Sequence, residues 1–372
     1  MQDNHQRINV HSLKTGMVLA EDAVTPNGQL LIPSGTEITE NHLFRMNLYQ
    51  ISSAAVLIMD GATAIDPLLD NPSDDVMMPG NMNPKGIRLR KTESFLRFNN
   101  VYMKVDTIVR DLFDDIEAGN PIDQAKLLAA IDTLMNSARL KSDLFNYMNQ
   151  IHSEDYHTYV HSINVAILCN IFGSWLKLPQ DALDELTIAA LIHDIGKTKI
   201  PNKLLNKSEK LTEEEFNQLH QHVQIGYDMI KDTTLSDRIK KSVLLHHERN
   251  NGSGYPFEFT REQIPDFAKI IAITDVYDAM TSSRTYHKKF SPFKVIQLFE
   301  QESCGYLDTK FLFTFLEDIA HYYLGEEVKL SDGTIGKIVF IHNQSPSRPI
   351  IQSGDLMIDL LITEDLSIEE IL

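Results

Sequence analysis

Histidine and aspartate side chains recur at wide intervals along this chain. Imidazoles and carboxylates are ligand types that hold divalent transition metals in proteins. Two such metals held close together with a shared hydroxide can cleave a phosphodiester bond. The pattern therefore predicts a metal-dependent phosphohydrolase, whose candidate ligands are His161, His193, Asp194, His222, His246, His247 and Asp275.

Each of these histidines alone has a simpler explanation, because a lone histidine beside an apolar stripe is more often structural than a metal ligand. Here, however, five of the 14 histidines belong to one set within a single predicted helical block. The adjacent pairs His193-Asp194 and His246-His247 each offer two donors that could reach different metals. His157 lies one helical turn before His161, on the same helix face, and is a further candidate.

Asp275 and Asp278 lie three residues apart in a predicted helix. On an exposed helix surface both would simply be solvated. Asp275 has apolar neighbours, among them Ile273 and Val276, and an unpaired carboxylate in such surroundings is costly unless a cation holds it. We therefore predict that Asp275 is a metal ligand and that Asp278 supports the site from outside, as a partner of Arg284.

A glycine-rich loop lies between the last histidine pair and Asp275. Gly252 and Gly254 free its backbone, and Pro256 stiffens it. Tyr255 could present its ring to a nucleotide base or pack into the core. By itself this loop is typical of an ordinary turn.

The charge of the chain limits its partners. With 372 residues, two or three domains are expected, each with its own core. The formal net charge of -18 leaves no broad basic face, so a nucleic-acid polymer is not an expected partner. A small nucleotide stays compatible, because bound cations would dominate the field of the site.

The cysteines and the apolar segments indicate a compartment. Cys169 and Cys304 are the only cysteines, and they give no disulfide framework. The first residues lack an apolar signal segment, and no apolar run of roughly 18 residues occurs. These features predict a cytoplasmic protein with no membrane anchor.

The element patterns predict a mainly α chain. Short apolar segments between turn formers fill the first 60 residues, and helical periodicity dominates from about residue 92. One helix is expected over 122–150, and another from the capping box at Thr212 to Ile230. The expected segments are a small β-rich accessory domain (1–60), a linker (61–90), a connecting helix (91–124), an all-α catalytic domain (125–324) and a hairpin-like C-terminal β extension (325–372).

Four spaced motifs together resemble the HD-GYP family, a branch of the HD superfamily of metal-dependent phosphohydrolases. The resemblance covers roughly residues 125–324. It implies an all-α domain that hydrolyses the second messenger cyclic di-GMP to pGpG and GMP. The motifs are His193-Asp194-Ile195-Gly196-Lys197, His222 to Gly226, His246-His247-Glu248 with Gly254-Tyr255-Pro256, and Asp275 to Tyr286.

The resemblance also assigns roles to single residues. The seven candidate ligands would hold two divalent metals, iron or manganese, with Asp194 bridging them. Lys197 would contact the scissile phosphate and assist the leaving oxygen, and Arg284 would bind substrate phosphate. Glu248 would support the ligands from outside.

Two positions depart from the family pattern. His157 stands where some members have a glutamate that holds a third metal, so two metals are expected and three stay open. His287 stands where a basic residue often helps to hold the nucleotide, and Lys288 could substitute for it. Residues 1–60, with the segment Leu13 to Ala20, look like the small domain of unassigned role that often precedes HD-GYP domains.

Three functions compete at this stage. The first is a cyclic di-GMP phosphodiesterase. The second is a weakly active nucleotide receptor that docks proteins with GGDEF domains through the Gly-Tyr-Pro loop. The third is an HD phosphohydrolase for another cyclic dinucleotide, such as cyclic GMP-AMP. The sequence leaves homodimer formation and the signal sensed by the N-terminal domain open.

Overall fold

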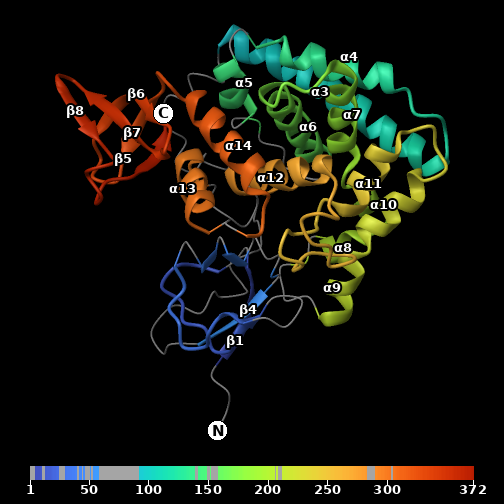
Figure 1. The fold of residues 1–372 in the computed structure, drawn as a ribbon, viewed down its shortest axis with the longest axis horizontal. Coiled ribbons are helices and arrows are strands. Elements are labelled where there is room, and N and C mark those ends of the chain that lie inside the picture. The colour runs from blue at the N-terminus through green and yellow to red at the C-terminus, as the bar shows by residue number, and fades with distance from the viewer. Residues whose placement is uncertain are drawn as a thin grey trace, which may run out of the picture. The chain divides into compact units, whose positions relative to one another are not determined.

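The structure is a computed structural model, and the chain forms two compact units, Met1–Arg90 with Lys207–Thr212, and Lys91–Asn206 with Glu213–Leu372. Figure 1 colours the chain from the N-terminus to the C-terminus. The residues that the structure describes are 5–10, 13–24, 30–39, 42–43, 45–46, 51, 53–57, 92–138, 141–148, 151, 158–205, 207, 212–282, 290–302 and 305–372.

The first unit contains two small antiparallel sheets. Strand β1 (His5–Asn9) pairs with β4 (Ser53–Leu57), and β2 (Ala23–Val24) pairs with β3 (Leu30–Ile32). This agrees with the β-rich module expected at the N-terminus. The predicted linker, 61–90, lies outside the described residues.

The second unit is mainly helical, as expected. Helices α3, α6 and α7 pack side by side, and α12 lies against α6 (Figure 1). Helix α6 is buried along most of its length, so it forms the centre of this unit. The helices are α3 (Glu93–Ala118), α4 (Gln124–Met135), α5 (Lys141–Met148), α6 (Thr158–Trp175), α7 (Gln180–Ile192), the 3-10 helix η2 (Ile195–Lys199), α8 (Asn202–Leu205), α9 (Glu213–His220), α10 (His222–Ile230), α11 (Asp237–Leu245), α12 (Asp266–Thr281), α13 (Pro292–Glu302) and α14 (Thr309–His321).

Two predicted helices are each broken in two. The helix expected over 122–150 ends at Met135, where the hydroxyl of Ser137 donates to the carbonyl of Leu134 at 2.6 Å. Such local hydrogen bonds compete with continuation of the helix. The helix expected to end at Ile230 is interrupted at Gln221, so His222 starts a new helix.

The C-terminal segment forms a five-stranded antiparallel sheet of order β8-β7-β6-β5-β9. Its hairpin and its strand near Leu356 were expected, whereas β7 and β9 were not. Two prolines in β7 argue against a strand, but they lie where the register with β6 shifts, which is where a sheet tolerates proline. The strands are β5 (Glu327–Leu330), β6 (Ile335–His342), β7 (Ser345–Ser353), β8 (Leu356–Asp359) and β9 (Ile368–Ile371).

This sheet packs on the last helices of the same unit. The carboxylate of Glu300, on α13, accepts hydrogen bonds from the backbone N–H and the hydroxyl of Ser347 in β7. The hydroxyl of Ser291 donates to the carbonyl of Ile368 in β9 at 2.9 Å. The sheet is therefore joined to the helical part by polar contacts as well as by apolar packing.

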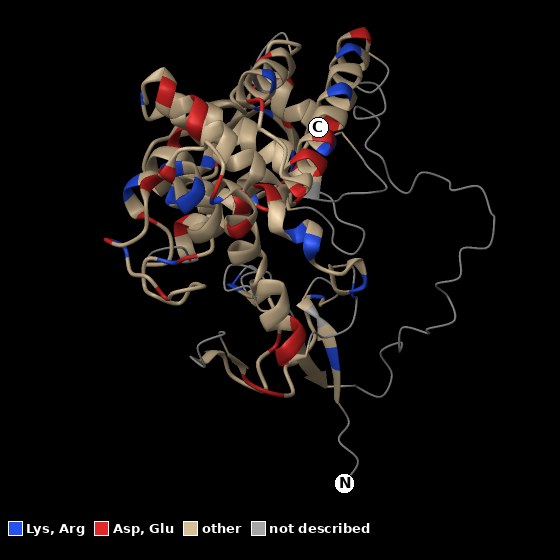
Figure 2. Cartoon of the chain, turned by 90° about the vertical axis from the view of Figure 1, so that its right-hand side faces the viewer, with Lys and Arg blue, Asp and Glu red and all other residues tan. Residues whose placement is uncertain are grey.

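Charged positions are distributed over many elements. Figure 2 shows Lys and Arg interspersed with Asp and Glu along the helices. A search of the described helices for a span both long and apolar enough to cross a bilayer finds none.

Candidate metal centre

The predicted ligands come from helix ends and from two central helices. His193 directly follows α7, Asp194 precedes η2, His222 begins α10, and His246 directly follows α11. A Cβ atom at Gly196 would lie 1.9 Å from the carbonyl oxygen of His222. Only glycine therefore lets η2 approach α10 closely enough to bring Asp194 beside His222.

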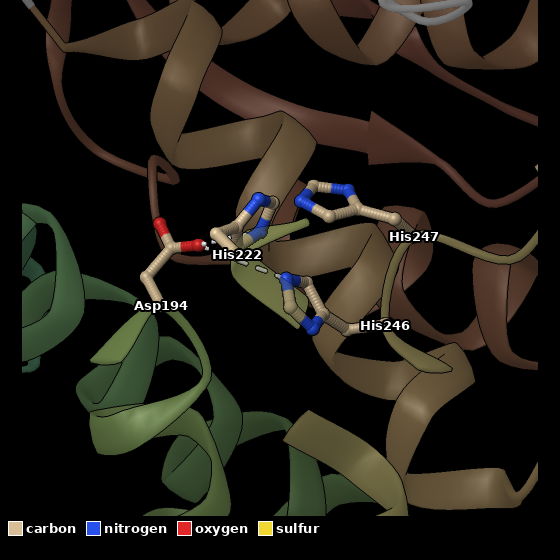
Figure 3. Close-up of side chains that lie close together, drawn as sticks. All are labelled: Asp194, His222, His246 and His247. Carbon is tan, nitrogen blue, oxygen red and sulfur yellow. Dashed lines mark ion pairs between the residues drawn. The ribbon is translucent and has the colours of Figure 1, made fainter. Parts of the chain in front are cut away.

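One group of ligand atoms surrounds a single oxygen of Asp194. Its Oδ1 atom lies 3.3 Å from Nε2 of His222 and 3.7 Å from Nε2 of His246. His247 completes the group, whose ligand atoms all lie within 4.8 Å of one another. Figure 3 shows the three imidazoles gathered in front of the Asp194 carboxylate. All four residues are buried.

A second group surrounds the other oxygen of Asp194. Its Oδ2 atom lies 3.3 Å from Nε2 of His193 and 3.8 Å from Nε2 of His161. The same Nε2 of His161 lies 3.0 Å from Oδ1 of Asp275. The two groups share Asp194, and this geometry suits a carboxylate that bridges two ions.

The protonation of three imidazoles follows from their hydrogen bonds. A carbonyl oxygen only accepts, so an Nδ1 beside it carries a proton, and the tautomer of the neutral ring then has its lone pair on Nε2. The Nε2 atoms of His193, His222 and His246, with Oδ1 of Asp194, are buried and lack a hydrogen-bond partner among the described residues. Buried acceptor atoms that face one another without a hydrogen-bond donor destabilise the fold unless a cation binds them. These ligand atoms therefore suit a metal ion. The Nδ1 contacts are His193 to Ala190 at 2.7 Å, His222 to Leu219 at 2.8 Å and His246 to Val243 at 2.9 Å.

The pKa values of the ligands support the same conclusion. Burial lowers the pKa of His246 to about 4 and that of His247 well below its usual value, so both imidazoles are neutral at pH 7. Burial raises the pKa of Asp194, but His193 and Lys197 outweigh this effect and hold it well below its ordinary value. Neutral imidazoles and an ionised carboxylate are the forms that bind metal.

His161 differs from these histidines. Burial lowers its pKa, but hydrogen bonds to Asp275 and Asp278 outweigh burial and raise it to about 9. Its Nδ1 lies 2.7 Å from Oδ2 of Asp278. A metal at its Nε2 would therefore replace a proton.

Lys197 lies at the edge of the cluster. Its Nζ is 2.5 Å from Oδ2 of Asp194, and its side chain is 26% exposed. The ammonium group therefore borders both the bridging carboxylate and solvent, a position from which it could contact a bound phosphate.

The two predicted supporting residues have different surroundings. Asp278 is 3% exposed and contacts the ligand His161 directly. Glu248 accepts the backbone N–H groups of Phe257, at 2.7 Å, and Phe259, at 2.9 Å. Glu248 thus orders the loop that follows the Gly-Tyr-Pro motif. Asp275 and Asp278 are both largely buried, which excludes simple surface solvation for them.

Tyr255 packs against imidazoles of the site. Its ring stacks on His220 at a centroid distance of 3.7 Å and on His247 at 4.8 Å, and the ring of His222 lies at 6.2 Å. The tyrosine therefore packs directly beside two of the candidate ligands.

Some predicted residues cannot be placed, and some neighbours of the site were not predicted. His157, Arg284 and Lys288 lie outside the described residues. Asn164 contacts Asp278 from α6, and its position one turn after His161 could have indicated this. Two further contacts have no signal in the sequence, because they come from distant segments. They are the stacking of His220 on Tyr255 and the hydrogen bond from Tyr102, on α3, to Asn164.

Comparisons with known proteins agree with this fold. A family model described as HD domain matches residues 132–310. Cyclic di-GMP phosphodiesterase PA4108 of Pseudomonas aeruginosa is 31% identical over 278 residues, which cover 74% of this chain and 66% of that protein. Cyclic di-GMP phosphodiesterase PdeB of Borreliella burgdorferi is 34% identical over 200 residues, 54% of this chain and 52% of that protein.

A third relative has a different named substrate. The 3'3'-cGAMP-specific phosphodiesterase 1 of Vibrio cholerae is 31% identical over 194 residues, 52% of this chain and 44% of that protein. The chain thus matches between 44% and 66% of the length of these three relatives.

A solved structure has a related fold. Bd1817, a HDG"Y"P protein from Bdellovibrio bacteriovorus, matches with a TM-score of 0.50 and 16% identity, over 85% of this chain and 99% of that one. This likeness bears on the fold alone. The HD domain match and the relatives named above, together with the His193-Asp194 and Gly254-Tyr255-Pro256 motifs, lead to one assignment: the chain belongs to the HD-GYP family.

Proposed function

We propose that this chain is a metal-dependent phosphodiesterase that hydrolyses cyclic di-GMP to pGpG and then to GMP, lowering the level of this second messenger in the cytoplasm. One observation carries the proposal: the two oxygens of Asp194 face two different groups of buried imidazoles. A carboxylate between two metals can hold them as close together as two-metal cleavage of a phosphodiester requires. The relatives named as cyclic di-GMP phosphodiesterases support the choice of substrate.

The donor set would hold two divalent ions, and we propose iron or manganese. When bound, the ions would activate a water molecule as the nucleophile and neutralise charge on the phosphate. The backbone carbonyls behind His193, His222 and His246 keep the three rings from rotating, so their lone pairs stay fixed on the site. A third ion, held with the help of His157, is the alternative.

The protein's own cations would handle the phosphate and the leaving group. Lys197 would hold a proton beside the phosphate and donate it to the leaving 3'-oxygen, since its Nζ is close to Asp194 and partly exposed. Arg284 and Lys288 would bind the phosphates, and Tyr255 would contribute its hydroxyl edge.

A direct assay tests the proposal. Protein purified without oxygen, with iron or manganese supplied, is analysed for metals per chain and then given cyclic di-GMP. About two ions per chain and the successive appearance of pGpG and GMP are the expected results. A fully metallated protein that leaves cyclic di-GMP intact would contradict the proposal.

Variants of two lysines on η2 distinguish a catalytic effect from a structural one. Replacing Lys197 by alanine should lower kcat by roughly 100-fold or more with the metal content unchanged. Lys199 lies on the same short helix, but its Nζ pairs with Glu117 at 2.6 Å. Lys199→Ala is therefore the matched control and should keep kcat within about twofold.

A second candidate substrate is cyclic GMP-AMP, which the match to the cGAMP-specific phosphodiesterase favours. The ratio of kcat/KM for cyclic di-GMP and 3'3'-cGAMP, measured in one competition assay, decides between them. A ratio above 1 supports the first substrate and a ratio below 1 the second.

The receptor function stays as the remaining alternative. Tight binding of uncut cyclic di-GMP would favour it, as would capture of a GGDEF-domain protein that is lost on mutation of the Gly254-Tyr255-Pro256 loop. The same samples, examined by light scattering, show whether the chain forms a homodimer.

A further inference from the structure

A buried chain of hydrogen bonds leads from α3 to the metal centre. The hydroxyl of Tyr102, on α3, donates to Oδ1 of Asn164 at 3.0 Å, and Val160 O lies 3.2 Å from the same hydroxyl. The amide of Asn164 donates to Oδ1 of Asp278 at 3.0 Å. The other oxygen of Asp278 accepts from Nδ1 of His161 at 2.7 Å.

We propose that Tyr102 is a positioning residue for the metal ligand His161 and acts on it through Asn164 and Asp278. This inference rests on the proposed metal site, but it needs neither the substrate nor the reaction. Tyr102 lies outside the matched HD region, 132–310, so the metal site would depend on a helix that precedes that region.

The chemistry of the groups fixes the direction of every bond in this chain. The carboxylate of Asp278 only accepts, so both Asn164 and His161 must donate to it. The Asn164 amide then presents its oxygen to the other side, where the Tyr102 hydroxyl supplies a donor. With its Nδ1–H held by Asp278, His161 points Nε2 toward Asp275 and Asp194; this atom carries a proton in the metal-free protein and would present its lone pair to a bound metal.

Burial makes the position of His161 depend on these hydrogen bonds. Tyr102 is 1% exposed, and Asn164 and Asp278 are each 3% exposed, so water cannot replace a lost donor without rearrangement. Without the hydroxyl, the Asn164 oxygen is a buried acceptor that lacks a side-chain donor among the described residues. Rotation of the amide toward a new donor would take its N–H away from Asp278 and loosen the carboxylate that holds His161.

The expected change in metal affinity depends on how many residues lie between Tyr102 and the metal ligand. Removal of a group that touches a metal ligand typically weakens metal binding 10- to 100-fold. Tyr102 is two residues further out, because Asn164 and Asp278 lie between it and His161. We therefore expect Tyr102→Phe to weaken binding of one ion by roughly three- to tenfold, below that range.

Tyr147 provides a matched control. Its ring packs against Phe98 at 5.2 Å, and the ring of Tyr102 packs against the same Phe98 at 6.0 Å. The Tyr147 hydroxyl donates to Ser94 at 2.9 Å, near the start of α3 and outside the chain that leads to His161. Tyr147→Phe thus removes a similar hydroxyl from the same aromatic cluster and leaves the hydrogen bonds between Tyr102 and His161 unchanged.

The first measurement is metal affinity. Full-length metal-free protein is titrated with Mn²⁺ in competition with a chelator, for the wild type, Tyr102→Phe and Tyr147→Phe. The expected result is weaker binding of one ion in Tyr102→Phe alone. Equal affinities in all three proteins, or equal weakening in both variants, would overturn the proposal. A wild type that binds no Mn²⁺ would overturn the metal site and this inference with it.

The second measurement needs no metal. It therefore distinguishes a failure of the proposed metal site from a failure of the inference about Tyr102. The Nδ1–H signal of His161 is followed by NMR in metal-free protein with ¹⁵N-labelled histidine, and it is assigned with His161→Gln. The signal should shift or exchange faster with solvent in Tyr102→Phe and stay in place in Tyr147→Phe. An unchanged signal in Tyr102→Phe would refute the action of Tyr102 on His161 even if the metal site is correct.

Discussion

The two halves of the metal centre are anchored in different ways. In one half, His222 and His246 donate from Nδ1 to carbonyls three residues earlier in the same chain segment. In the other half, His161 on α6 donates to a carboxylate on α12, 117 residues away in the sequence. The first half therefore depends on local backbone geometry, and the second depends on how α3, α6 and α12 pack.

This difference has a consequence for the metal-free protein. Burial leaves His246 neutral at pH 7, whereas two carboxylates keep His161 protonated and paired. His161 is therefore already held by charge before a metal binds, whereas the Nε2 atoms of His193, His222 and His246 lack a hydrogen-bond partner among the described residues. Removal of single residues should separate the two behaviours.

The largest effect is expected at the residue that both halves share. Asp194→Ala removes both bridging oxygens, so bound metal should fall from about two ions per chain to nearly none and turnover below detection. Elemental analysis and the cyclic di-GMP assay measure this. Asp228→Ala removes an exposed carboxylate of α10 that pairs with Lys231, and it should change neither quantity. An Asp194→Ala protein that keeps both ions would refute the bridging role.

A comparison of His161→Ala with His222→Ala tests the two anchoring modes. Each variant should bind about one ion instead of two, because the other group keeps its own ligands. Without metal, His161→Ala should lose about 3 kcal/mol of unfolding free energy, since it removes the protonated imidazole that pairs with the largely buried carboxylates of Asp275 and Asp278. His222→Ala should lose less, because its Nε2 has no partner to lose. Urea unfolding of both metal-free proteins checks the order, and equal losses would contradict the contrast.

The supporting carboxylates offer the next smaller effect. Asp278→Asn keeps the shape of the side chain but weakens its hold on His161, and one ion should bind roughly 10- to 100-fold more weakly. Glu248→Gln changes the charge of a carboxylate that contacts loop N–H groups, so metal affinity should stay within about twofold. Chelator competition measures both variants. A larger loss in Glu248→Gln than in Asp278→Asn would mean that the loop, not the His161 anchor, controls the site.

The halves also differ in how much of them the sequence predicted. Residue type and spacing were enough to nominate all the ligands that the structure brings together, because few arrangements other than a metal site explain buried, clustered imidazoles. The predicted partner of Asp278, Arg284, lies outside the described residues, and the described residues add His161, Asn164 and Ser282 as contacts that were not predicted. Such contacts join distant helices, and no local pattern encodes them.

The elements show the same limit. Helical periodicity located the helices of the second unit, but it continues through the breaks at Ser137 and Gln221, where side-chain hydrogen bonds and packing decide. Strand β7 was missed because its prolines outweigh its apolar residues in any local pattern. Tyr102 could not have been connected to the site from sequence, since only the packing of α3 on α6 brings it to Asn164.

Asp308 allows the smallest test of local against distant anchoring, away from the metal centre. Its carboxylate caps α14 by accepting the N–H groups of Lys310 and Phe311, and it also pairs with Arg261 at 3.0 Å. Burial raises its pKa, but these bonds and the charge of Lys269 outweigh burial and lower it. Asp308→Asn keeps a capping oxygen but loses the ion pairs, so the unfolding free energy at pH 7 should fall by about 1 kcal/mol.

The pH dependence of that loss identifies its cause. A carboxylate whose pKa is lowered on folding stabilises the protein above its unfolded pKa, near 3.8, and loses this contribution as the pH falls through its folded pKa. The difference between the wild type and Asp308→Asn should therefore shrink as the pH is lowered from 7 toward 3. Urea unfolding across this range measures it. A difference that stays constant with pH would assign the loss to the local cap, and the distant ion pairs would then contribute nothing measurable.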